Sequence, residues 1–291
     1  MNDTTTGLAG TTTFDLGGAT VHRLGFGAMQ LTGDGVWGEP DDPGEAKRVL
    51  RRAVDLGVDF IDTADSYGPE VSERLIGEAL APYPDGLVVA TKAGLERSGP
   101  GRWEPNGRPD HLRTACDGSL RRLRLDRIPL YQLHRIDPEV PVEESVGTLV
   151  ELRDEGKIER IGLSEVGVDE LRTVQELCPV TSVQNRFSIN DQQWSDVVDA
   201  CAADGIGFIP WFPLGSGELG DLAEVLDRTA HAHGSDRYAV ALAWLLRRSD
   251  NIVAIPGTSS VEHLESNVSA AHLVDEITDA EWSELDRHGD R

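Results

Sequence analysis

The strongest constraint on the fold is a rhythm that repeats eight times along the 291 residues, in which a short apolar run precedes a stretch with helical apolar spacing. Most runs are continuously apolar, as are parallel strands that are covered on both faces. We expect strands near residues 24–28, 58–62, 86–91, 128–133, 158–163, 180–184, 206–211 and 252–256. We expect helices near residues 43–56, 70–81, 109–123, 142–155, 168–177, 192–203, 235–247 and 260–271. The length would also allow two domains, but no Pro-rich linker divides the chain, so the pattern predicts a single α/β domain over residues 1–291, a closed (β/α)8 TIM barrel.

Other segments lie outside this rhythm. The stretch 13–29 predicts an N-terminal β-hairpin that turns at Gly17 and Gly18 and leads into the first strand. Extra helices are expected near 219–232 and 278–287. Helix ends are indicated by Gly57, which is typical of a C-cap, and by Ser235, which is typical of an N-cap. Residues 1–12 are expected to be flexible.

The composition restricts the partners. A net charge of −24 argues against nucleic-acid and anionic-membrane binding, so an anionic ligand would have to be held by local donors. No apolar run approaches the ~20 residues that span a bilayer, and the start of the chain does not resemble a signal peptide, which predicts a cytoplasmic protein. The three cysteines, Cys116, Cys178 and Cys201, are far apart, so we expect small core residues and neither a disulfide framework nor a metal site.

A barrel places its chemistry at the carboxyl ends of its strands. The stretch DFIDTADSYG, residues 59–68, ends one strand with Asp62 and Tyr67, and the next strand ends with Lys92. A buried ammonium needs a carboxylate partner, so we predict an ion pair between Lys92 and Asp62. The alternative interpretation is that this ion pair has no catalytic role and only closes the barrel. His134 ends the fourth strand, and a lone histidine there is also compatible with a structural role. Asp65 and Ser66 are interpreted as loop structure.

Together these four residues have a chemical logic. The ammonium of Lys92, held by Asp62, is expected to lower the pKa of the Tyr67 phenol, which then delivers a proton to a carbonyl oxygen. His134 would orient that oxygen by a hydrogen bond. The sequence shows neither a nucleophile with a base nor a metal-ligand cluster, so hydrolysis and metal chemistry fit poorly. Proton delivery to a carbonyl implies a hydride donor.

These residues resemble the aldo-keto reductase family over nearly the whole chain. The resemblance is carried by FIDTADSYG, ATKAG, LYQLHR, GKIERIGLSEV, VQNRFS, PWFPLGSG and IPGTSSVEHLESN. It implies the barrel fold, a catalytic tetrad of Asp62, Tyr67, Lys92 and His134, and NADPH bound across the barrel mouth without a Rossmann domain. The sequence indeed has no GxGxxG motif after a strand.

The resemblance also implies a set of cofactor contacts. Ser164 and Gln184 would bind the nicotinamide carboxamide, or would simply cap strand ends. Trp211 would stack on the nicotinamide ring, or would simply belong to the core. Asn267 would face the adenine. The loop to Gly217 would follow the pyrophosphate, and the TSSVE segment would hold the adenosine phosphate or simply cap a helix. The full predicted set is Gly27, Ala28, Met29, Asp62, Ser164, Gln184, Trp211, Phe212, Pro213, Leu214, Gly215, Ser216, Gly217, Ile255, Gly257, Thr258, Ser259, Ser260, His263 and Asn267.

Three positions depart from the pattern of the family. Glu165 stands where Asn is more frequent, and a carboxylate offers no amide donor. Trp211 stands where Tyr or Phe is more frequent, although Trp also stacks. His263 stands where many members have a phosphate-binding Arg, which weakens the case for strict NADPH preference and leaves NADH open.

The substrate is predicted less sharply. GAMQL, GVWG, FPLG and TSSVEHL look most like the bacterial branch that includes pyridoxal reductases. Met29, Trp37 and Trp103 are candidate walls of the substrate pocket, or plain packing. The interpretation is an NADPH-dependent reductase of a small aldehyde or ketone, with pyridoxal as candidate substrate and with no nucleic-acid or membrane partner. The alternatives are a sugar or natural-product ketoreductase and a nucleotide-binding redox-sensing subunit with little turnover; the oligomeric state is not predicted.

Overall fold

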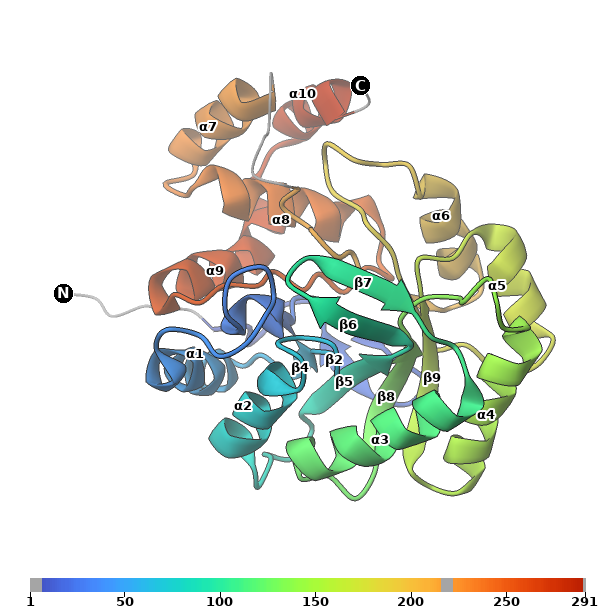
Figure 1. Cartoon of the computed structure of the whole chain (residues 1–291). Helices are drawn as coiled ribbons and strands as arrows, with labels where there is room; N and C mark the ends of the chain where they lie inside the picture. The colour runs from blue at the N-terminus through green and yellow to red at the C-terminus, as the bar shows by residue number, and fades with distance from the viewer. Residues whose placement is uncertain (1–6, 216–221, 290–291) are drawn as a thin grey trace.

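A curled sheet of seven parallel strands forms the centre of the protein, in the computed structural model that describes residues 7–215 and 222–289 (Figure 1). The strand order is β11-β10-β9-β8-β5-β4-β3. The strands are β3 (Phe26–Gly27), β4 (Phe60–Asp62), β5 (Val88–Ala93), β8 (Ile128–Leu133), β9 (Ile158–Ser164), β10 (Ser182–Gln184) and β11 (Gly207–Phe208). Each predicted strand from the first to the seventh has a counterpart here, within a few residues.

The eighth predicted strand, 252–256, takes its place in the sheet through isolated bridges. Ile252 pairs with Phe208 of β11, and Ala254 pairs in parallel with Leu24, just before β3. Main-chain bonds from Val253 to the carbonyl of Phe208 and from Ala254 to the carbonyl of Arg23 tie the segment to both neighbours. The segment therefore joins the two edges of the sheet, so the barrel is closed as predicted.

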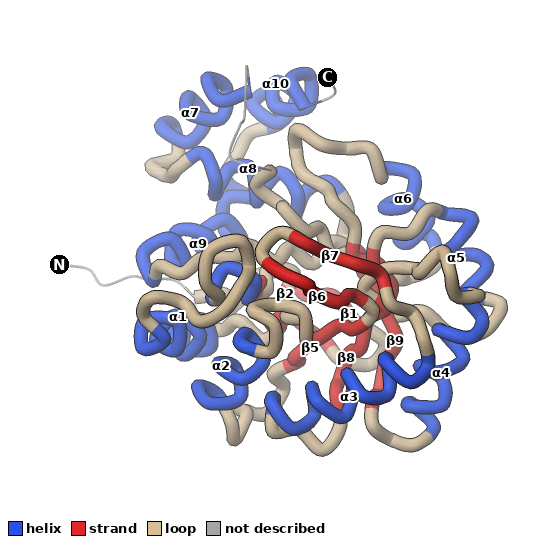
Figure 2. Tube along the Cα trace, viewed as in Figure 1, coloured by secondary structure: helices blue, strands red, loops and turns tan. Residues whose placement is uncertain are grey.

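Helices surround this sheet, as Figure 2 shows. The eight that follow the barrel rhythm are α1 (Pro43–Asp55), α2 (Val71–Leu80), α3 (Pro109–Leu123), α4 (Val142–Asp154), α5 (Val168–Gln175), α6 (Ser195–Ala203), α8 (Arg237–Arg248) and α9 (Val261–Glu276). Two further helices, α7 (Leu222–Ala232) and α10 (Asp279–Gly289), pack against each other beside α8. These positions confirm the predicted helices, although residues 219–221 of the expected extra helix lie outside the described part of the chain.

Helix ends follow the expected chemistry with one difference. Gly57 lies just after α1 with a positive φ of 88°, which suits the predicted C-cap. At the start of α8, however, the capping residue is Asp236, whose carboxylate accepts from the amides of Tyr238 and Ala239. The predicted cap, Ser235, is one residue too early because its amide donates to Ala230 and continues the turn that ends α7.

The predicted N-terminal hairpin forms from β1 (Thr13–Asp15) and β2 (Thr20–His22), with positive φ at Gly17 and Gly18. It contributes Leu16 and Val21 to a buried apolar cluster inside the barrel. That cluster also contains Phe60, Val88, Ala90, Leu130, Ile209, Val253 and Ile255. The hairpin therefore fills one end of the barrel, which leaves the opposite mouth for a ligand.

Two features of the chain differ from simple expectation. Leu8, within the start 1–12 that is expected to be flexible, is fully buried and its amide donates to Leu56. A second hairpin, β6 (Leu95–Gly99) and β7 (Arg102–Pro105), lies in front of the sheet in Figure 1 and is not predicted. Its sequence is polar and rich in Gly and Pro, so it lacks the alternation that indicates a strand.

The remaining core lies between sheet and helices. The three cysteines are buried there as free thiols, which confirms the prediction of small core residues. Among the helices of the described ranges, none is long and apolar enough to cross a membrane. Within residues 7–215 and 222–289, no group of three or more His, Cys, Asp or Glu side chains is placed to hold a metal ion.

Candidate active site

A cavity of about 640 Å³ opens at the carboxyl ends of the barrel strands. It is bounded by the ends of β3, β4, β8, β9 and β10, by the β6–β7 hairpin and by the loop after β11. Its lining includes predicted site residues from all of these segments: Gly27, Met29, Asp62, Tyr67, Trp103, His134, Ser164, Gln184, Trp211, Phe212, Pro213, Leu214, Gly215, Ile255 and Gly257. The strand ends that are far apart in sequence thus meet at one concave surface, where a barrel is expected to place its site.

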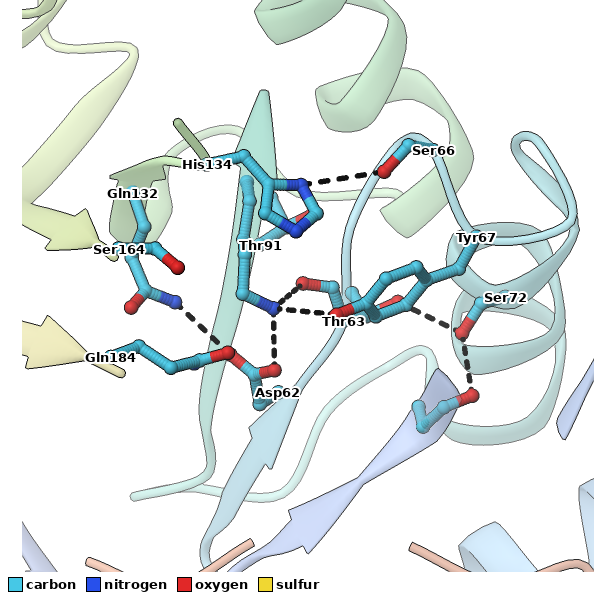
Figure 3. Close-up of polar contacts among 12 residues, drawn as sticks. Asp62, Thr63, Ser66, Tyr67, Ser72, Thr91, Gln132, His134, Ser164 and Gln184 are labelled. Atoms are coloured by element: carbon cyan, nitrogen blue, oxygen red, sulfur yellow. Dashed lines mark hydrogen bonds and ion pairs between the residues drawn. The ribbon is translucent and has the colours of Figure 1, made fainter. Parts of the chain in front are cut away.

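The predicted ion pair is present at the bottom of this cavity. Lys92 Nζ lies 2.5 Å from Asp62 Oδ1 and 2.8 Å from the carbonyl oxygen of Thr63 (Figure 3). Lys92 is 0% and Asp62 is 2% exposed, so both charges are removed from water and depend on each other. Burial lowers the pKa of Lys92, but the neighbouring Asp62 and Tyr67 outweigh it and raise that pKa overall, so the amine stays an ammonium.

The second carboxylate oxygen of Asp62 is also occupied. Gln132 on β8 and Gln184 on β10 each donate a side-chain amide hydrogen to Asp62 Oδ2, over 3.0 and 2.9 Å. In Figure 3 the side chains of Gln132 and Gln184 both lie on the same side of Asp62. Gln132 is not among the predicted residues, and the only signal for it is a lone polar side chain in an otherwise apolar strand. These bonds hold the carboxylate in one orientation toward Lys92.

The Tyr67 phenol lies 3.2 Å from Lys92 Nζ, which brings the proposed acid and the ammonium into contact. The expectation that its pKa is lowered is wrong for this structure. Burial raises the pKa of Tyr67 above its ordinary value, and the opposing effect of Lys92 does not cancel it, since Asp62 also raises it. The phenol is therefore held in its protonated form, ready to donate.

His134 faces the same space from the end of β8. Its Nδ1 lies 3.4 Å from the hydroxyl of Ser66, so Ser66 has a contact in the site and is more than the loop residue that the sequence suggests. Burial lowers the pKa of His134 well below its ordinary value, and the positive charges of Lys92 and Arg135 add to this effect. The imidazole is thus neutral near neutral pH. Asp65, the other loop acid, does not line the cavity.

The β6–β7 hairpin forms the wall opposite these groups. The Trp103 ring meets Tyr67 and His134 edge to face, with ring centroids 6.3 and 6.4 Å apart. Arg97 lies 3.5 Å from the centroid of Trp103 and donates to the carbonyl oxygens of Gly35, Val36 and Ser66. Trp37 lies on another side of Arg97 and does not line the cavity, so Val36 takes the place predicted for it.

On the side of the cavity predicted for a nicotinamide, the polar side chains form hydrogen bonds with neighbouring protein groups. The hydroxyl of Ser164 accepts from Arg135 over 3.1 Å, while the Gln184 amide donates to Asp62. Glu165 has a left-handed backbone with φ 56° and accepts from the Trp211 indole over 2.5 Å and from the Arg186 amide over 2.8 Å. Glu165 therefore has a clear structural function, which is to fix the edge of the Trp211 ring.

Comparison with known proteins identifies the family. Residues 23–290 match the model of the aldo/keto reductase family. The chain belongs to this family. It is 45% identical over 277 residues to an uncharacterized oxidoreductase of Schizosaccharomyces pombe, covering 95% of this chain and 90% of the relative. It is 41% identical over 273 residues to the pyridoxine 4-dehydrogenase of Escherichia coli K12, covering 91% and 95% of the two chains.

Solved structures of aldo-keto reductases share the fold. A thermostable aldo-keto reductase has a TM-score of 0.82 at 28% identity, covering 95% of this chain and 99% of its own. An aldo-keto reductase of Klebsiella pneumoniae in complex with NADPH has a TM-score of 0.80 at 25% identity, covering 95% and 94%. Membership of the family makes this chain an NAD(P)H-dependent oxidoreductase.

The loop after β11 follows the cavity as far as the structure describes it. Phe212, Pro213, Leu214 and Gly215 line the cavity, with positive φ at Phe212 and Gly215. Gly215 has a φ of 63°, a left-handed conformation that glycine adopts without strain. Ser216 and Gly217, the rest of the predicted pyrophosphate loop, lie outside the described residues.

The residues predicted to bind the adenosine phosphate in this aldo/keto reductase form hydrogen bonds within their own segment. Thr258 Oγ1 accepts from the Ser260 amide, and Ser260 Oγ accepts from the His263 amide at the start of α9. The TSSVE segment therefore does cap a helix, as the simpler interpretation holds. Six predicted cofactor residues do not line the cavity: Ala28, Thr258, Ser259, Ser260, His263 and Asn267.

Proposed function

We propose that this protein reduces an aldehyde or ketone with NADPH, and that Tyr67 donates the proton. The observation that carries the proposal is the contact of a protonated phenol with the Lys92–Asp62 pair at the bottom of a cavity, beside a neutral His134. Polar groups of this kind gather where charge develops on a carbonyl oxygen. Family membership supports the same reaction class.

The residues of the cavity fit a nicotinamide dinucleotide. The cavity continues from Tyr67 past Trp211 to Gly215, so it has more room than a small carbonyl compound needs. Gly27 and Gly257 both line the cavity where two backbone segments pass close together, because a Cβ on either would lie 2.6 Å from a backbone carbonyl oxygen of the other segment. Ser164 and Gln184 offer hydroxyl and amide groups, and Trp211 offers a ring face, as a nicotinamide carboxamide and ring require.

The bound cofactor would supply the hydride, and the protein handles the proton. Tyr67 gives its hydroxyl proton to the carbonyl oxygen, and the phenolate that forms is stabilised by Lys92 at 3.2 Å. Asp62 keeps the ammonium in place. If Ser66 donates to Nδ1 of His134, the imidazole carries its proton on Nε2 and can donate to the same carbonyl oxygen. Trp103 packs edge to face against Tyr67, so its ring would shield this region from water.

Pyridoxal is the substrate we propose among small carbonyl compounds. It is an aromatic aldehyde, and Trp103 and Met29 offer it apolar walls beside Tyr67 and His134. The 41% identity to a pyridoxine 4-dehydrogenase supports a substrate of this kind.

The proposal is tested by Tyr67→Phe, assayed as NADPH oxidation with pyridoxal. A general acid typically accelerates a reaction by a factor of ~10²–10⁴. Removal of the Tyr67 hydroxyl should therefore lower kcat by about 10³-fold. The dissociation constant of NADPH, measured by fluorescence titration, should change by less than about twofold. Tyr238→Phe is the matched control because Tyr238 is 42% exposed on α8 and lies outside the cavity. Unchanged turnover of Tyr67→Phe would refute the role of this residue.

A substrate panel separates the finer alternatives. The wild type is assayed with pyridoxal, aldose sugars, a steroid-like ketone and simple aldehydes. We expect the largest kcat/KM for pyridoxal. A larger value for a sugar or a ketone would replace pyridoxal as the substrate. Tight NADPH binding with negligible turnover on the whole panel would instead support a redox-sensing subunit.

A further inference from the structure

Arg135 places a guanidinium in the wall of the cavity, next to the catalytic groups. It follows His134 at the end of β8 and is half-buried. Its Nη1 donates to the carbonyl oxygen of His134 over 2.7 Å and to Ser164 Oγ over 3.1 Å. These two bonds fix the position of the side chain, but they involve only one of its three nitrogen atoms.

The other donors of Arg135 are open to a ligand. Among the residues that the structure describes, none accepts from its Nε or Nη2, and none of their carboxylates forms an ion pair with its guanidinium. Burial lowers the pKa of Arg135, and the charge of Glu165 opposes this lowering only in part. The carboxylate of Glu165 is already engaged by the Trp211 indole and the Arg186 amide.

A second arginine shows what a purely structural guanidinium looks like in this protein. Arg97, at the other wall, uses its Nε on the carbonyl oxygen of Arg102 and its two Nη atoms on those of Val36, Ser66, Gly35 and Gly99. All three nitrogen atoms of Arg97 are thus satisfied by the main chain. Arg135 has a main-chain partner only at Nη1, so its other two nitrogen atoms have no comparable use within the described protein.

The position of this charge relative to the reacting atoms is informative. Arg135, Tyr67 and His134 line the same cavity. Arg135 follows His134 directly in the chain and donates to Ser164 Oγ over 3.1 Å, so its guanidinium lies in the cavity wall beside the groups that would surround the carbonyl oxygen. The Lys92 ammonium, by contrast, is already neutralised by Asp62. In a chain with a net charge of −24, Arg135 is thus the cavity group suited to hold an anionic oxygen.

We propose that Arg135 is a specificity-determining residue, which binds an acidic oxygen on the atom next to the one that carries the reacting carbonyl group. This inference rests on the proposed carbonyl reduction and specifies its substrate class as ortho-hydroxy aromatic aldehydes. Pyridoxal has this arrangement, because its acidic ring hydroxyl is adjacent to its aldehyde. The acidic oxygen would accept from the free nitrogen atoms of Arg135, while the aldehyde oxygen faces Tyr67 and His134.

The test uses two substrates that differ by a single oxygen, pyridine-4-carbaldehyde and 3-hydroxypyridine-4-carbaldehyde. The variants are Arg135→Met, which removes the charge, and Arg135→Lys, which keeps it without the planar fork. The wild type should prefer the hydroxylated substrate in kcat/KM. A hydrogen bond to a charged group corresponds to a factor of roughly 10 to 100, and Arg135→Met should lose this preference. Its kcat/KM for the substrate without the hydroxyl should fall by a smaller factor than its kcat/KM for the hydroxylated substrate, and Arg135→Lys should keep an intermediate preference.

A second measurement distinguishes the substrate from the cofactor. NADPH affinity, followed by fluorescence titration, should be the same in wild type and Arg135→Met. An equal loss for both substrates together with weaker NADPH binding would overturn the proposal, since Arg135 would then serve the cofactor. If Arg135→Met does not fold, as thermal unfolding would show, Arg135→Gln replaces it with the same expected outcome.

Turnover by the wild type distinguishes a failure of the proposed reductase function from a failure of the proposed role of Arg135. Turnover of both aldehydes with an unchanged substrate ratio in the variants would refute the role of Arg135 and leave carbonyl reduction intact. Absence of turnover with either aldehyde and with the whole carbonyl panel would refute the reductase function itself, and with it the role of Arg135.

Discussion

The two ends of the cofactor-sized site are built on different principles. At the catalytic end, Lys92 and Asp62 are buried and their polar atoms bond to one another and to strand neighbours. At the end proposed for the adenosine, Thr258 Oγ1 accepts from the Ser260 amide and Ser260 Oγ caps α9, and neither residue lines the cavity. The polar groups of the first end therefore hold one another in place at the cavity, whereas those of the second hold the start of a helix. We therefore expect substitutions at the catalytic end to have the larger effects.

The largest effect is expected for Lys92→Met. The substitution leaves the Asp62 carboxylate buried without its ammonium, and breaking a buried pair from one side costs about 3–5 kcal/mol of unfolding free energy. Turnover should also fall by at least about 10²-fold, because Tyr67 loses the charge that stabilises its phenolate. Urea unfolding and NADPH oxidation measure the two effects. A loss of stability under about 1 kcal/mol would show that the catalytic end is not preorganised by this pair.

The double variant Lys92→Met/Asp62→Asn is the control for this comparison. It removes both charges, so no uncompensated carboxylate remains and at least half of the lost stability should return. Activity should not return, because the ammonium is still absent. Recovery of activity would contradict the assigned role of Lys92.

A smaller effect is expected for Ser66→Ala. Ser66 lies 3.4 Å from His134 Nδ1 and acts as a positioning residue, because it would fix the tautomer of the imidazole. Loss of this single bond should lower kcat by about 3–10-fold, with KM changed by less than about twofold. Ser72→Ala is the matched control, since Ser72 is equally buried but bonds to Thr63 and Ala28 instead. Equal kcat losses in both variants would indicate a general effect on folding.

The buried His134 predicts a pH dependence of stability. Its pKa in the folded state is well below the value of about 6.5 in an unfolded chain, so between the two values only the unfolded state binds the proton. The stability conferred by the neutral imidazole is therefore present above about pH 6.5 and is lost as the pH falls. Relative to His134→Gln, the wild type should lose about 1 kcal/mol between about pH 7.5 and pH 5.5 in urea unfolding. Parallel curves for the two proteins would contradict a lowered pKa.

The catalytic end is also where sequence interpretation succeeds. Asp62, Lys92 and His134 each follow an apolar run, and the geometry of a parallel barrel brings such ends together without further information. The sequence pattern does not predict how strongly opposing effects, such as burial and a nearby charge, act on the pKa of a site residue. The direction of the pKa shift at Tyr67 depends on how strongly burial opposes Lys92, and this burial comes partly from Trp103 on a hairpin that has no strand signal.

Other parts of the site escape prediction for similar reasons. Gln132 and Arg135 flank His134 in the sequence LYQLHR, but only their contacts show that Gln132 holds Asp62 and that Arg135 has unused donors. Glu165 departs from the family pattern, and its role becomes clear only from its bond to Trp211. Trp37 was predicted from its place in a loop, yet the loop turns its ring toward Arg97. Side-chain direction in loops is set by such tertiary contacts.

The smallest effect is expected at the adenosine end, for His263→Arg. His263 is exposed in the first turn of α9, at the position where the resemblance described above predicts a phosphate-binding arginine. A permanent charge on a solvated surface contributes up to about 1 kcal/mol, so NADPH affinity should rise by about 3–5-fold. NADH lacks the extra phosphate, and its affinity should not change. His231→Arg, which adds the same charge on α7, is the control, and the gain should shrink as salt is added. A rise for both nucleotides would mean that the new charge acts through the general field, and a wild type that binds NADH as well as NADPH would overturn the choice of cofactor.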